Sequence, residues 1–291
     1  MRGEDSSGAT ARTAPPQPTP RPALVVYAWN GREAPLALVT ADTAPEFDVL
    51  VFDYSGACGV TEAAGWPILS CRTECKGEIY REVHRHLARS GELYEYVGLI
   101  DDDIELAWSD LNRLLAIARG HGLDSFQAAL TPDSHHAHHW LVARGGQVLR
   151  PLPWVEVMMP FYRTALFMAG GDYYARSISS YGLDQFVFPA LQKLMGLDKV
   201  AIIDAVTVRH GRPITSDDKV FANGLTAHQE RAVQWRMARA QVARECPDLV
   251  GTRWYFQTFS PLGGHHRYWP LRLAAPWLWL RALHHRMCRQ A

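Results

Sequence analysis

Short apolar runs alternate with amphipathic segments over the first 130 residues of the chain. Five runs are rich in apolar, β-branched or aromatic side chains and end near turn residues: 23–29, 49–54, 66–70, 96–100 and 126–130. Continuous apolar runs of this length are typical of strands buried on both faces of a sheet. Between them, residues 77–89 and 109–119 place apolar side chains at helical spacing, with Ser109 as the expected N-cap. The pattern predicts an α/β fold with a mixed, mostly parallel sheet flanked by helices.

The two ends of the chain depart from this alternation. Residues 1–22 contain five prolines and few large apolar side chains, which predicts a disordered tail. We expect one folded domain over residues 23–224 and a helical extension over 225–291, opening with an amphipathic helix over 225–246. The last forty residues are rich in Trp, Tyr, Phe and Arg, so they either pack as core or lid or contact a membrane interface.

Composition limits the classes of partner and compartment. Thirty basic residues balance thirty acidic ones, so no overall field favours nucleic acid, and we expect no nucleic-acid partner. Five cysteines without a CxxC pair fit a reducing compartment, and the first residues lack the apolar region of a signal peptide. No apolar run approaches the roughly 20 residues of a spanning helix. We therefore expect a cytoplasmic protein, with peripheral membrane contact through the C-terminal segment left open.

A cluster of carboxylates follows one of the predicted strands. Residues 97–100 lead directly into Asp101, Asp102 and Asp103. Adjacent carboxylates repel each other at the end of a buried strand, and a divalent cation such as Mg²⁺ or Mn²⁺ would remove that repulsion. An extended backbone would turn Asp101 and Asp103 to one side and Asp102 to the other. An acidic turn at the start of the next helix is the alternative, and the triplet alone does not decide between them.

Six segments, taken in order, carry a family resemblance. They are residues 51–56 (VFDYSG), 94–103 (YEYVGLIDDD), 127–132 (QAALTP), 154–160 (WVEVMMP), 181–184 (YGLD) and 208–213 (VRHGRP). The series resembles the family known as domain of unknown function 707, whose members look like glycosyltransferases of the GT-A type. The resemblance runs from about residue 23 to residue 215. It implies a GT-A-like (Rossmann-like) single domain.

The resemblance also implies a metal site. Asp101 and Asp103 look like the outer carboxylates of the GT-A acidic motif, which bind Mn²⁺ or Mg²⁺ and, through it, the diphosphate of a nucleotide-sugar donor. Asp102 stands where the family often has Glu and is expected beside the donor. His210 resembles the late histidine that many GT-A enzymes use as a third metal ligand, although a lone histidine before glycine is often structural.

Four further residues receive roles from the resemblance. Asp184 stands where related folds place the base that takes a proton from the acceptor hydroxyl, with helix N-capping as the competing interpretation. Trp154 and Glu156 resemble residues that face the sugar or the acceptor, and Glu156 could instead form a structural salt bridge. Asp53, at the end of the second strand, is expected to accept hydrogen bonds from the base or ribose.

A histidine-rich run lies between residues 127–132 and residues 154–160, and its last two members, His138 and His139, belong to the same series. Residues 134–139 (SHHAHH) could suggest zinc, but no cysteine or carboxylate completes a familiar ligand spacing. We favour a polar loop near the active site.

The predicted function is metal-dependent transfer of a sugar from a nucleoside diphosphate sugar to an acceptor hydroxyl, with inversion at the anomeric carbon. The acceptor, a glycan, a lipid, a protein or a small molecule, is not encoded in any motif. Two alternatives stay open: another metal-dependent phosphoryl-transfer or hydrolytic enzyme, and a non-catalytic module that binds nucleotide sugars on the same fold.

Overall fold

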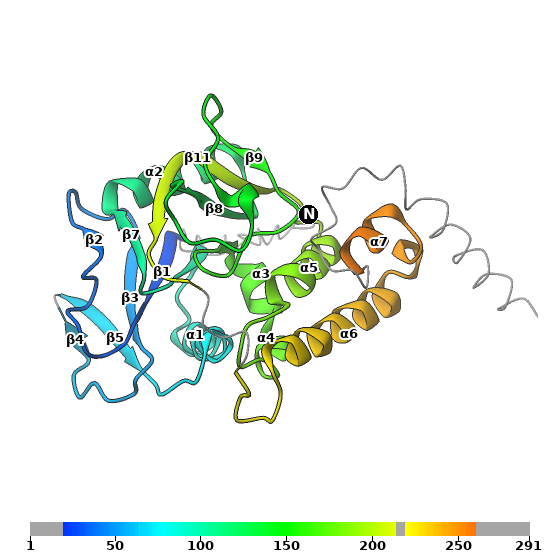
Figure 1. Cartoon of the computed structure of the whole chain (residues 1–291), viewed down its shortest axis with the longest axis horizontal. Coiled ribbons are helices and arrows are strands. Elements are labelled where there is room, and N and C mark those ends of the chain that lie inside the picture. The colour runs from blue at the N-terminus through cyan, green and yellow to red at the C-terminus, as the bar shows by residue number, and fades with distance from the viewer. Residues whose placement is uncertain (1–19, 64, 214–218, 260–291) are drawn as a thin grey trace, which may run out of the picture.

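The structure, a computed structural model, describes residues 20–63, 65–213 and 219–259. Its centre is an eleven-stranded sheet with the order β2-β7-β11-β8-β10-β6-β1-β3-β5-β4, in which β9 pairs with β11 (Figure 1). Most of the predicted N-terminal tail and the Trp-rich and Arg-rich end after residue 259 lie outside the described residues.

Five of the six long strands are those predicted from the apolar runs, and β11 is the sixth. Parallel pairing joins β1 to β3 and β6, β3 to β5, and β8 to β11. Their bounds are β1 Arg21–Trp29, β3 Asp48–Asp53, β5 Trp66–Ser70, β6 Tyr94–Ile100, β8 Ser125–Leu130 and β11 Val200–His210. The strand β1 begins two residues before the predicted start of the folded domain, because Arg21 pairs with Tyr94 of β6.

Short strands that the sequence pattern did not predict complete the sheet. They are β2 Val39–Thr40, β4 Glu62–Ala63, β7 Ile104–Ala107, β9 Arg150–Pro151 and β10 Phe161–Arg163. The strand β10 lies antiparallel between β6 and β8. The strand β7 pairs antiparallel with the end of β11, so that Ile104 lies opposite His210. This pairing brings the acidic triplet, which directly precedes β7, next to the predicted histidine ligand.

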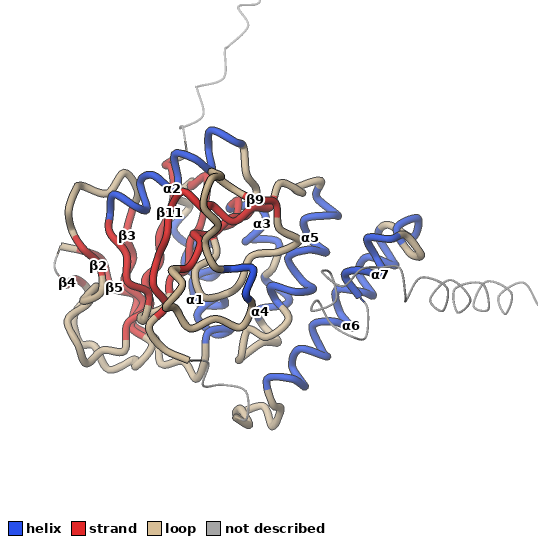
Figure 2. Tube along the Cα trace, turned by 45° about the horizontal axis from the view of Figure 1, so that its top comes forward, coloured by secondary structure: helices blue, strands red, loops and turns tan. Residues whose placement is uncertain are grey.

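Helices flank the sheet (Figure 2). Their bounds are α1 Lys76–Ser90, α2 Trp108–His121, α3 Thr164–Ala169, α4 Gly171–Tyr174, α5 Phe188–Met195, α6 Ala227–Glu245 and α7 Arg253–Phe259. A π-helical turn, Leu183–Val187, precedes α5, and two 3₁₀ turns span His139–Leu141 and Pro247–Leu249. The predicted helices over 77–89 and 109–119 are thereby confirmed, but the second is capped at Ala107 rather than at Ser109, whose hydroxyl binds Asp42.

The buried face of the long helix α6 includes two polar side chains. Its buried positions are Ala227, Glu230, Gln234, Ala238 and Val242, spaced as one helical stripe. The simple amphipathic pattern predicted for it is therefore wrong, because two of these buried positions hold polar side chains that bind the backbone of a neighbouring loop. Helices α6 and α7 lie at the end of the molecule opposite β4 and β5, and α6 packs on the π-helical turn and on α5 (Figure 1).

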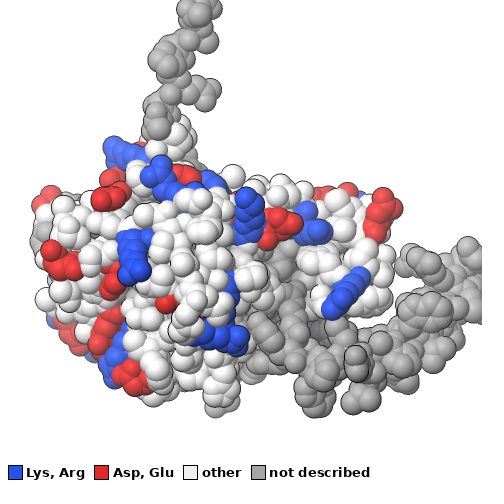
Figure 3. Space-filling view, turned by 90° about the horizontal axis from the view of Figure 1, so that it is seen from above, with Lys and Arg blue, Asp and Glu red and all other residues white. Residues whose placement is uncertain are grey.

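The described end of the aromatic C-terminal region packs in the core. Tyr255 and Phe259 of α7 are buried among apolar side chains, while Phe256 is exposed. Among the residues that the structure describes, no helix combines the length and apolar character needed to cross a membrane. Basic and acidic side chains are interspersed on the face shown in Figure 3, in keeping with the balanced charge of the sequence.

Candidate active site at the end of β6

The acidic triplet forms a tight turn at the end of β6. The amide of Ile104 donates to the carbonyl of Asp101 at 3.3 Å, and the amide of Asp101 donates to the carbonyl of Met158 at 3.0 Å. The extended arrangement predicted for the triplet is wrong, because the chain turns between Asp101 and Ile104. Asp102 and Asp103 consequently share one cationic partner, and Asp101 has another.

Lys76 is the partner of Asp101. Its Nζ lies 2.6 Å from Asp101 Oδ1, and it stands at the first position of α1. Burial raises the pKa of Asp101 to about 6 even though the ammonium group of Lys76 favours the charged carboxylate. Asp101 is thus a poorly solvated carboxylate whose charge depends on a neighbouring cation.

Arg212 bridges the other two carboxylates. Its Nε donates to Asp103 Oδ2 at 3.1 Å, and its Nη2 donates to Asp102 Oδ1. The hydroxyl of Tyr54, just beyond the end of β3, donates to Asp102 Oδ2 at 2.7 Å. Asp102 therefore has protein partners on both oxygens.

Asp103 and His210 form a pair suited to a divalent cation. His210 Nδ1 lies 2.8 Å from the carbonyl oxygen of His135, an atom that can only accept, so this nitrogen carries a proton. The other nitrogen, Nε2, faces Asp103 Oδ2 at 3.4 Å. Asp103 Oδ1 is buried and has no hydrogen-bond partner. A backbone carbonyl that fixes the tautomer in this way is the usual support of a metal-binding histidine.

The pKa values of Asp103 and His210 also reflect their proximity. Burial acts to raise the pKa of Asp103, but the neighbouring His210 and Arg212 outweigh it, so the pKa lies below its ordinary value. Burial acts to lower the pKa of His210, and the carboxylate of Asp103 outweighs it, so this pKa lies above its ordinary value. Each group therefore stabilises the charged form of the other, and the carboxylate of Asp103 favours a positive charge beside His210.

The protein supplies fewer than three clustered ligands. No group of three or more His, Cys, Asp and Glu side chains in the described part of the chain is arranged to hold a metal ion. Mg²⁺ and similar ions are commonly bound by one or two protein ligands together with water and substrate phosphates. Asp103 and His210 fit that second mode, and the other predicted ligand, Asp101, is paired with Lys76.

The histidine-rich loop packs beside this pair. His135 exchanges backbone and side-chain hydrogen bonds with His210, and His136 Nε2 lies 3.1 Å from His139 Nδ1. The loop was predicted to be polar and close to the active site, and its contact with His210 places it there.

Asp184 lies in the π-helical turn that precedes α5. Asp184 is 6% exposed, and its Oδ1 accepts a hydrogen bond of 2.8 Å from the amide of Gln185. Burial and, to a smaller extent, the charge of Glu156 raise the pKa of Asp184 to about 8, although the amide of Gln185 and the charge of Arg231 act in the opposite direction. A carboxylate whose pKa lies near neutral pH is suited to accepting a proton. The turn is capped at Gly182 without a side-chain bond, and a bond from the adjacent amide of Gln185 is not an N-cap bond, so the capping interpretation is not supported.

The charge of Glu156 acts on Asp184, and the charges of Asp103 and His210 act on Glu156. Glu156 also responds to the charge of Lys76. Its Oε2 accepts a hydrogen bond of 2.9 Å from the amide of Met158, and burial raises its pKa. The predicted alternative, a salt bridge to an arginine, is not formed among the described residues. The groups around Glu156 thus belong to one electrostatic site.

Asp53 has a structural environment. It is fully buried, and its two oxygens accept four hydrogen bonds, from the amides of Ser55 and Cys58 and the hydroxyls of Ser55 and Ser70. These bonds hold the loop after β3 and use all four lone-pair directions of the carboxylate. The geometry gives no support to the expected contact with a base or ribose, which stays a prediction.

Trp154 is enclosed by aromatic side chains. It is 2% exposed, and its ring meets those of His138 and Trp140 edge-on at centroid distances of 5.1 and 4.9 Å. The ring braces the histidine-rich loop and leaves little surface for a ligand. The expected sugar contact of Trp154 is likewise without geometric support and stays a prediction.

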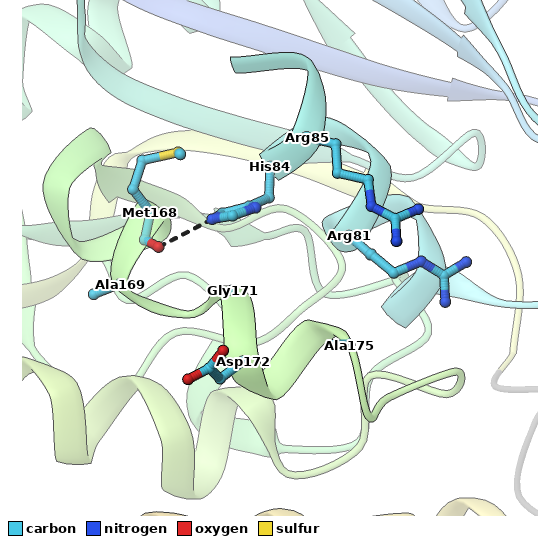
Figure 4. A pocket seen from close by; sticks show the side chains of 8 residues that line it. All are labelled: Arg81, His84, Arg85, Met168, Ala169, Gly171, Asp172 and Ala175. Carbon is cyan, nitrogen blue, oxygen red and sulfur yellow. Dashed lines mark hydrogen bonds between the residues drawn. The ribbon is translucent and has the colours of Figure 1, made fainter. Parts of the chain in front are cut away.

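A separate pocket of about 460 Å³ lies farther along α1 (Figure 4). Three residues of α1 line it together with residues of α3, α4 and the position just after α4: Arg81, His84, Arg85, Met168, Ala169, Gly171, Asp172 and Ala175. His84 Nε2 is bound to the carbonyl of Met168 at 3.1 Å, and the two arginines pair with Glu78 and Glu82. At 1.5 Å per residue, His84 lies about 12 Å along the helix from Lys76. The pocket therefore does not coincide with the acidic triplet.

Three cations of the site were missed in the sequence. Lys76 and Arg231 are single basic residues at the start of α1 and within α6, and nothing in their surroundings distinguishes them. Arg212 lies two residues after His210 within a segment that the resemblance already includes. Its position in that segment was a usable signal.

No protein-family model matches the chain, and no curated protein matches it. The resemblance to domain of unknown function 707 therefore stays a prediction. Solved structures do match. TarS 1-349 of S. aureus, in complex with UDP-GlcNAc, is 14% identical with a TM-score of 0.50, over 90% of this chain and 79% of that one. GalNAc-T7 with UDP, GalNAc and Mn²⁺ is 10% identical with a TM-score of 0.50, over 80% of this chain and 52% of that one.

At these identities the likeness shows the fold alone. The chain has the GT-A fold of these glycosyltransferases, a curled and mostly parallel sheet flanked by helices, as the resemblance predicted.

Proposed function

We propose that this protein is a glycosyltransferase that uses a divalent cation and moves a sugar from a nucleoside diphosphate sugar to an acceptor hydroxyl with inversion. The observation that carries the proposal is the Asp103–His210 pair at the end of β6, in which Asp103 Oδ1 is buried without a hydrogen-bond partner. A second kind of group, the buried acid Asp184, supports the proposal. Glu156 acts electrostatically on both.

The first kind of group serves the leaving diphosphate. Negative charge builds on that diphosphate as the bond to the sugar breaks, and a bound divalent cation would stabilise it as a Lewis acid. Asp103 and His210 would hold the ion, with Asp101 reaching it only after release from Lys76. Lys76 and Arg212, now bound to the triplet, are the cations closest to the place where the diphosphate would lie. The ion proposed here is Mn²⁺ or Mg²⁺.

The second kind of group serves the acceptor. Asp184 would accept the proton of the incoming hydroxyl, an effect usually worth about 10²–10⁴-fold in rate. A base that activates the acceptor on the side of the anomeric carbon opposite the diphosphate gives inversion. The raised pKa of Asp184, about 8, makes its carboxylate basic enough for this role and requires that it be ionised first.

The neighbours support the donor class. TarS was solved with UDP-GlcNAc, and GalNAc-T7 with UDP, GalNAc and Mn²⁺. A nucleotide sugar is accordingly the proposed donor, and a glycan, lipid, protein or small molecule the proposed acceptor. A two-metal phosphoryl-transfer site would need additional clustered carboxylates, and Asp101 and Asp102 are engaged by Lys76 and Arg212.

A thermal-shift panel tests the proposal. The full chain is heated with UDP, GDP, CDP and ADP sugars, each with and without Mn²⁺, and we expect stabilisation by one nucleotide that requires the metal. A ligand present at 100 times its Kd stabilises by about 2.7 kcal/mol, which gives a shift of several degrees. Equal melting temperatures across the whole panel would count against a donor site. Binding without release of the nucleoside diphosphate in the presence of candidate acceptors would instead favour a non-catalytic module.

A further inference from the structure

Arg231 of α6 lies against the turn that carries Asp184. Its Nε donates to Gln185 Oε1 at 2.7 Å, and its guanidinium carbon lies 5.0 Å from the centre of the Phe186 ring. A Cβ at Gly182 would come within 3.3 Å of the backbone of Arg231. Arg231 therefore contacts the residues on both sides of Asp184.

Part of this guanidinium is buried without a partner. Nη2 of Arg231 is inaccessible and forms no hydrogen bond. Leaving a charged donor buried and unpaired is unfavourable, so this arginine nitrogen calls for an explanation. Burial lowers the pKa of Arg231, whereas the nearby charge of Asp184 raises it. Arginine remains protonated at all ordinary pH values, so the charge is permanent.

The other groups that face Asp184 do not supply positive charge. Glu156, in the segment before β10, is a second acid and raises the pKa of Asp184. Tyr80 of α1 and Tyr162 of β10 respond to the charge of Asp184, and burial raises the pKa of each well above its ordinary value, so both stay neutral. Of the charged side chains with the largest effects on Asp184, Arg231 is the cationic one.

We propose that Arg231 is a positioning residue that fixes the turn from which Asp184 would take the acceptor proton and whose charge favours the ionised form of Asp184. The inference rests on the proposed function, in which Asp184 is the base. An opposite charge close by stabilises a buried carboxylate, and the bond to Gln185 holds the turn in register with α6. Helix α6 is then part of the active-site structure rather than an appended extension.

Substitution of Arg231 tests the inference through a pH profile. Arg231→Gln and Arg231→Met both remove the charge, and Met preserves the apolar stem over Phe186. In both variants the rising limb of the pH profile of kcat/KM should shift to higher pH by about one pH unit or more. Activity at pH 7 should fall about tenfold and recover at high pH. Arg231→Lys, which retains the charge, should keep the limb near that of the wild type.

Stability supplies a readout that does not depend on turnover. A buried acid whose folded pKa is raised loses stability as pH rises toward that pKa, because the unfolded state releases the proton more readily. Without Arg231 the decline in Tm should extend to higher pH. The extra decline should vanish when Asp184→Asn is combined with Arg231→Gln, since no carboxylate is left to titrate.

Arg239 provides a matched control on the same helix. It lies over the ring of Trp235 at 5.0 Å and binds the hydroxyl of Tyr255, away from the turn of Asp184. Arg239→Gln should leave both the pH limb and the shape of the Tm profile unchanged. The inference would be overturned if the rising limb of kcat/KM stayed at the wild-type pH in both neutral Arg231 variants. It would also be overturned if Arg231→Gln changed the Tm profile equally with and without Asp184→Asn. Full activity of Asp184→Asn would remove the base assignment alone, because the Tm cycle measures the Arg231–Asp184 coupling without any reaction.

Discussion

Asp184→Asn is expected to reduce sugar transfer by about 10²–10⁴-fold while leaving the binding of the nucleotide donor intact. The amide has nearly the shape of the carboxylate but cannot take a proton from the acceptor. The check combines steady-state kinetics with calorimetry of donor binding on the same preparation. In the wild type, kcat/KM should rise with pH toward the pKa of Asp184, about 8, because the base works only when ionised.

The same variant should be more stable than the wild type at alkaline pH. The pKa of Asp184 is about 8 in the folded protein against an ordinary value of 3.8. Between these values the folded state retains a proton that the unfolded state releases, so the free energy of unfolding decreases as pH rises. Asparagine removes that decrease, and the gain in Tm should therefore grow from pH 5 to pH 9. Normal turnover together with a flat Tm difference would contradict both the role and the environment assigned to Asp184.

Asp103→Ala is expected to abolish Mn²⁺-dependent binding of the nucleotide. The substitution removes one of two proposed ligands and leaves His210 without its carboxylate partner. Isothermal titration with UDP should show binding by the wild type in Mn²⁺, weak binding in EDTA, and no difference between the two conditions for the variant.

Asp133→Ala is the matched control for this measurement. Asp133 is an exposed acid that pairs with Arg209, in the loop beside the site but outside the acidic triplet. It should bind nucleotide and metal as the wild type does. If Asp103→Ala binds UDP as strongly as Asp133→Ala in the presence of Mn²⁺, the assignment of Asp103 to the metal is wrong.

The central sheet was predictable because its strands are buried on both faces. The runs that became β1, β3, β5, β6 and β8 needed no knowledge of their neighbours to be identified. The strand β10 has three residues and lies antiparallel between β6 and β8, and so short a segment carries no period of its own. Its position depends on Gly98, where a Cβ would lie 2.3 Å from the ring of Phe161. That close approach exists only in the folded chain.

The acidic residues of the site could be predicted from the sequence, whereas the cations that pair with them could not. Asp101, Asp102 and Asp103 stand together in the sequence, whereas Lys76 lies 25 residues and Arg212 more than 100 residues away from its partner. Long-range ion pairs of this kind have no local pattern. The polar stripe of α6, with Glu230 binding the amides of Ile178 and Ser179, was hidden for the same reason. A buried acid on a helix is informative only when the loop that it holds is known.

The central claim is that Asp103 and His210 hold a divalent cation that contacts the donor diphosphate. The most direct test is anomalous diffraction at the manganese edge from a crystal soaked with Mn²⁺ and UDP. We expect one strong peak within bonding distance of Asp103 and His210 Nε2, adjoining the diphosphate of UDP. Bound UDP with no manganese peak beside these two residues would contradict the claim.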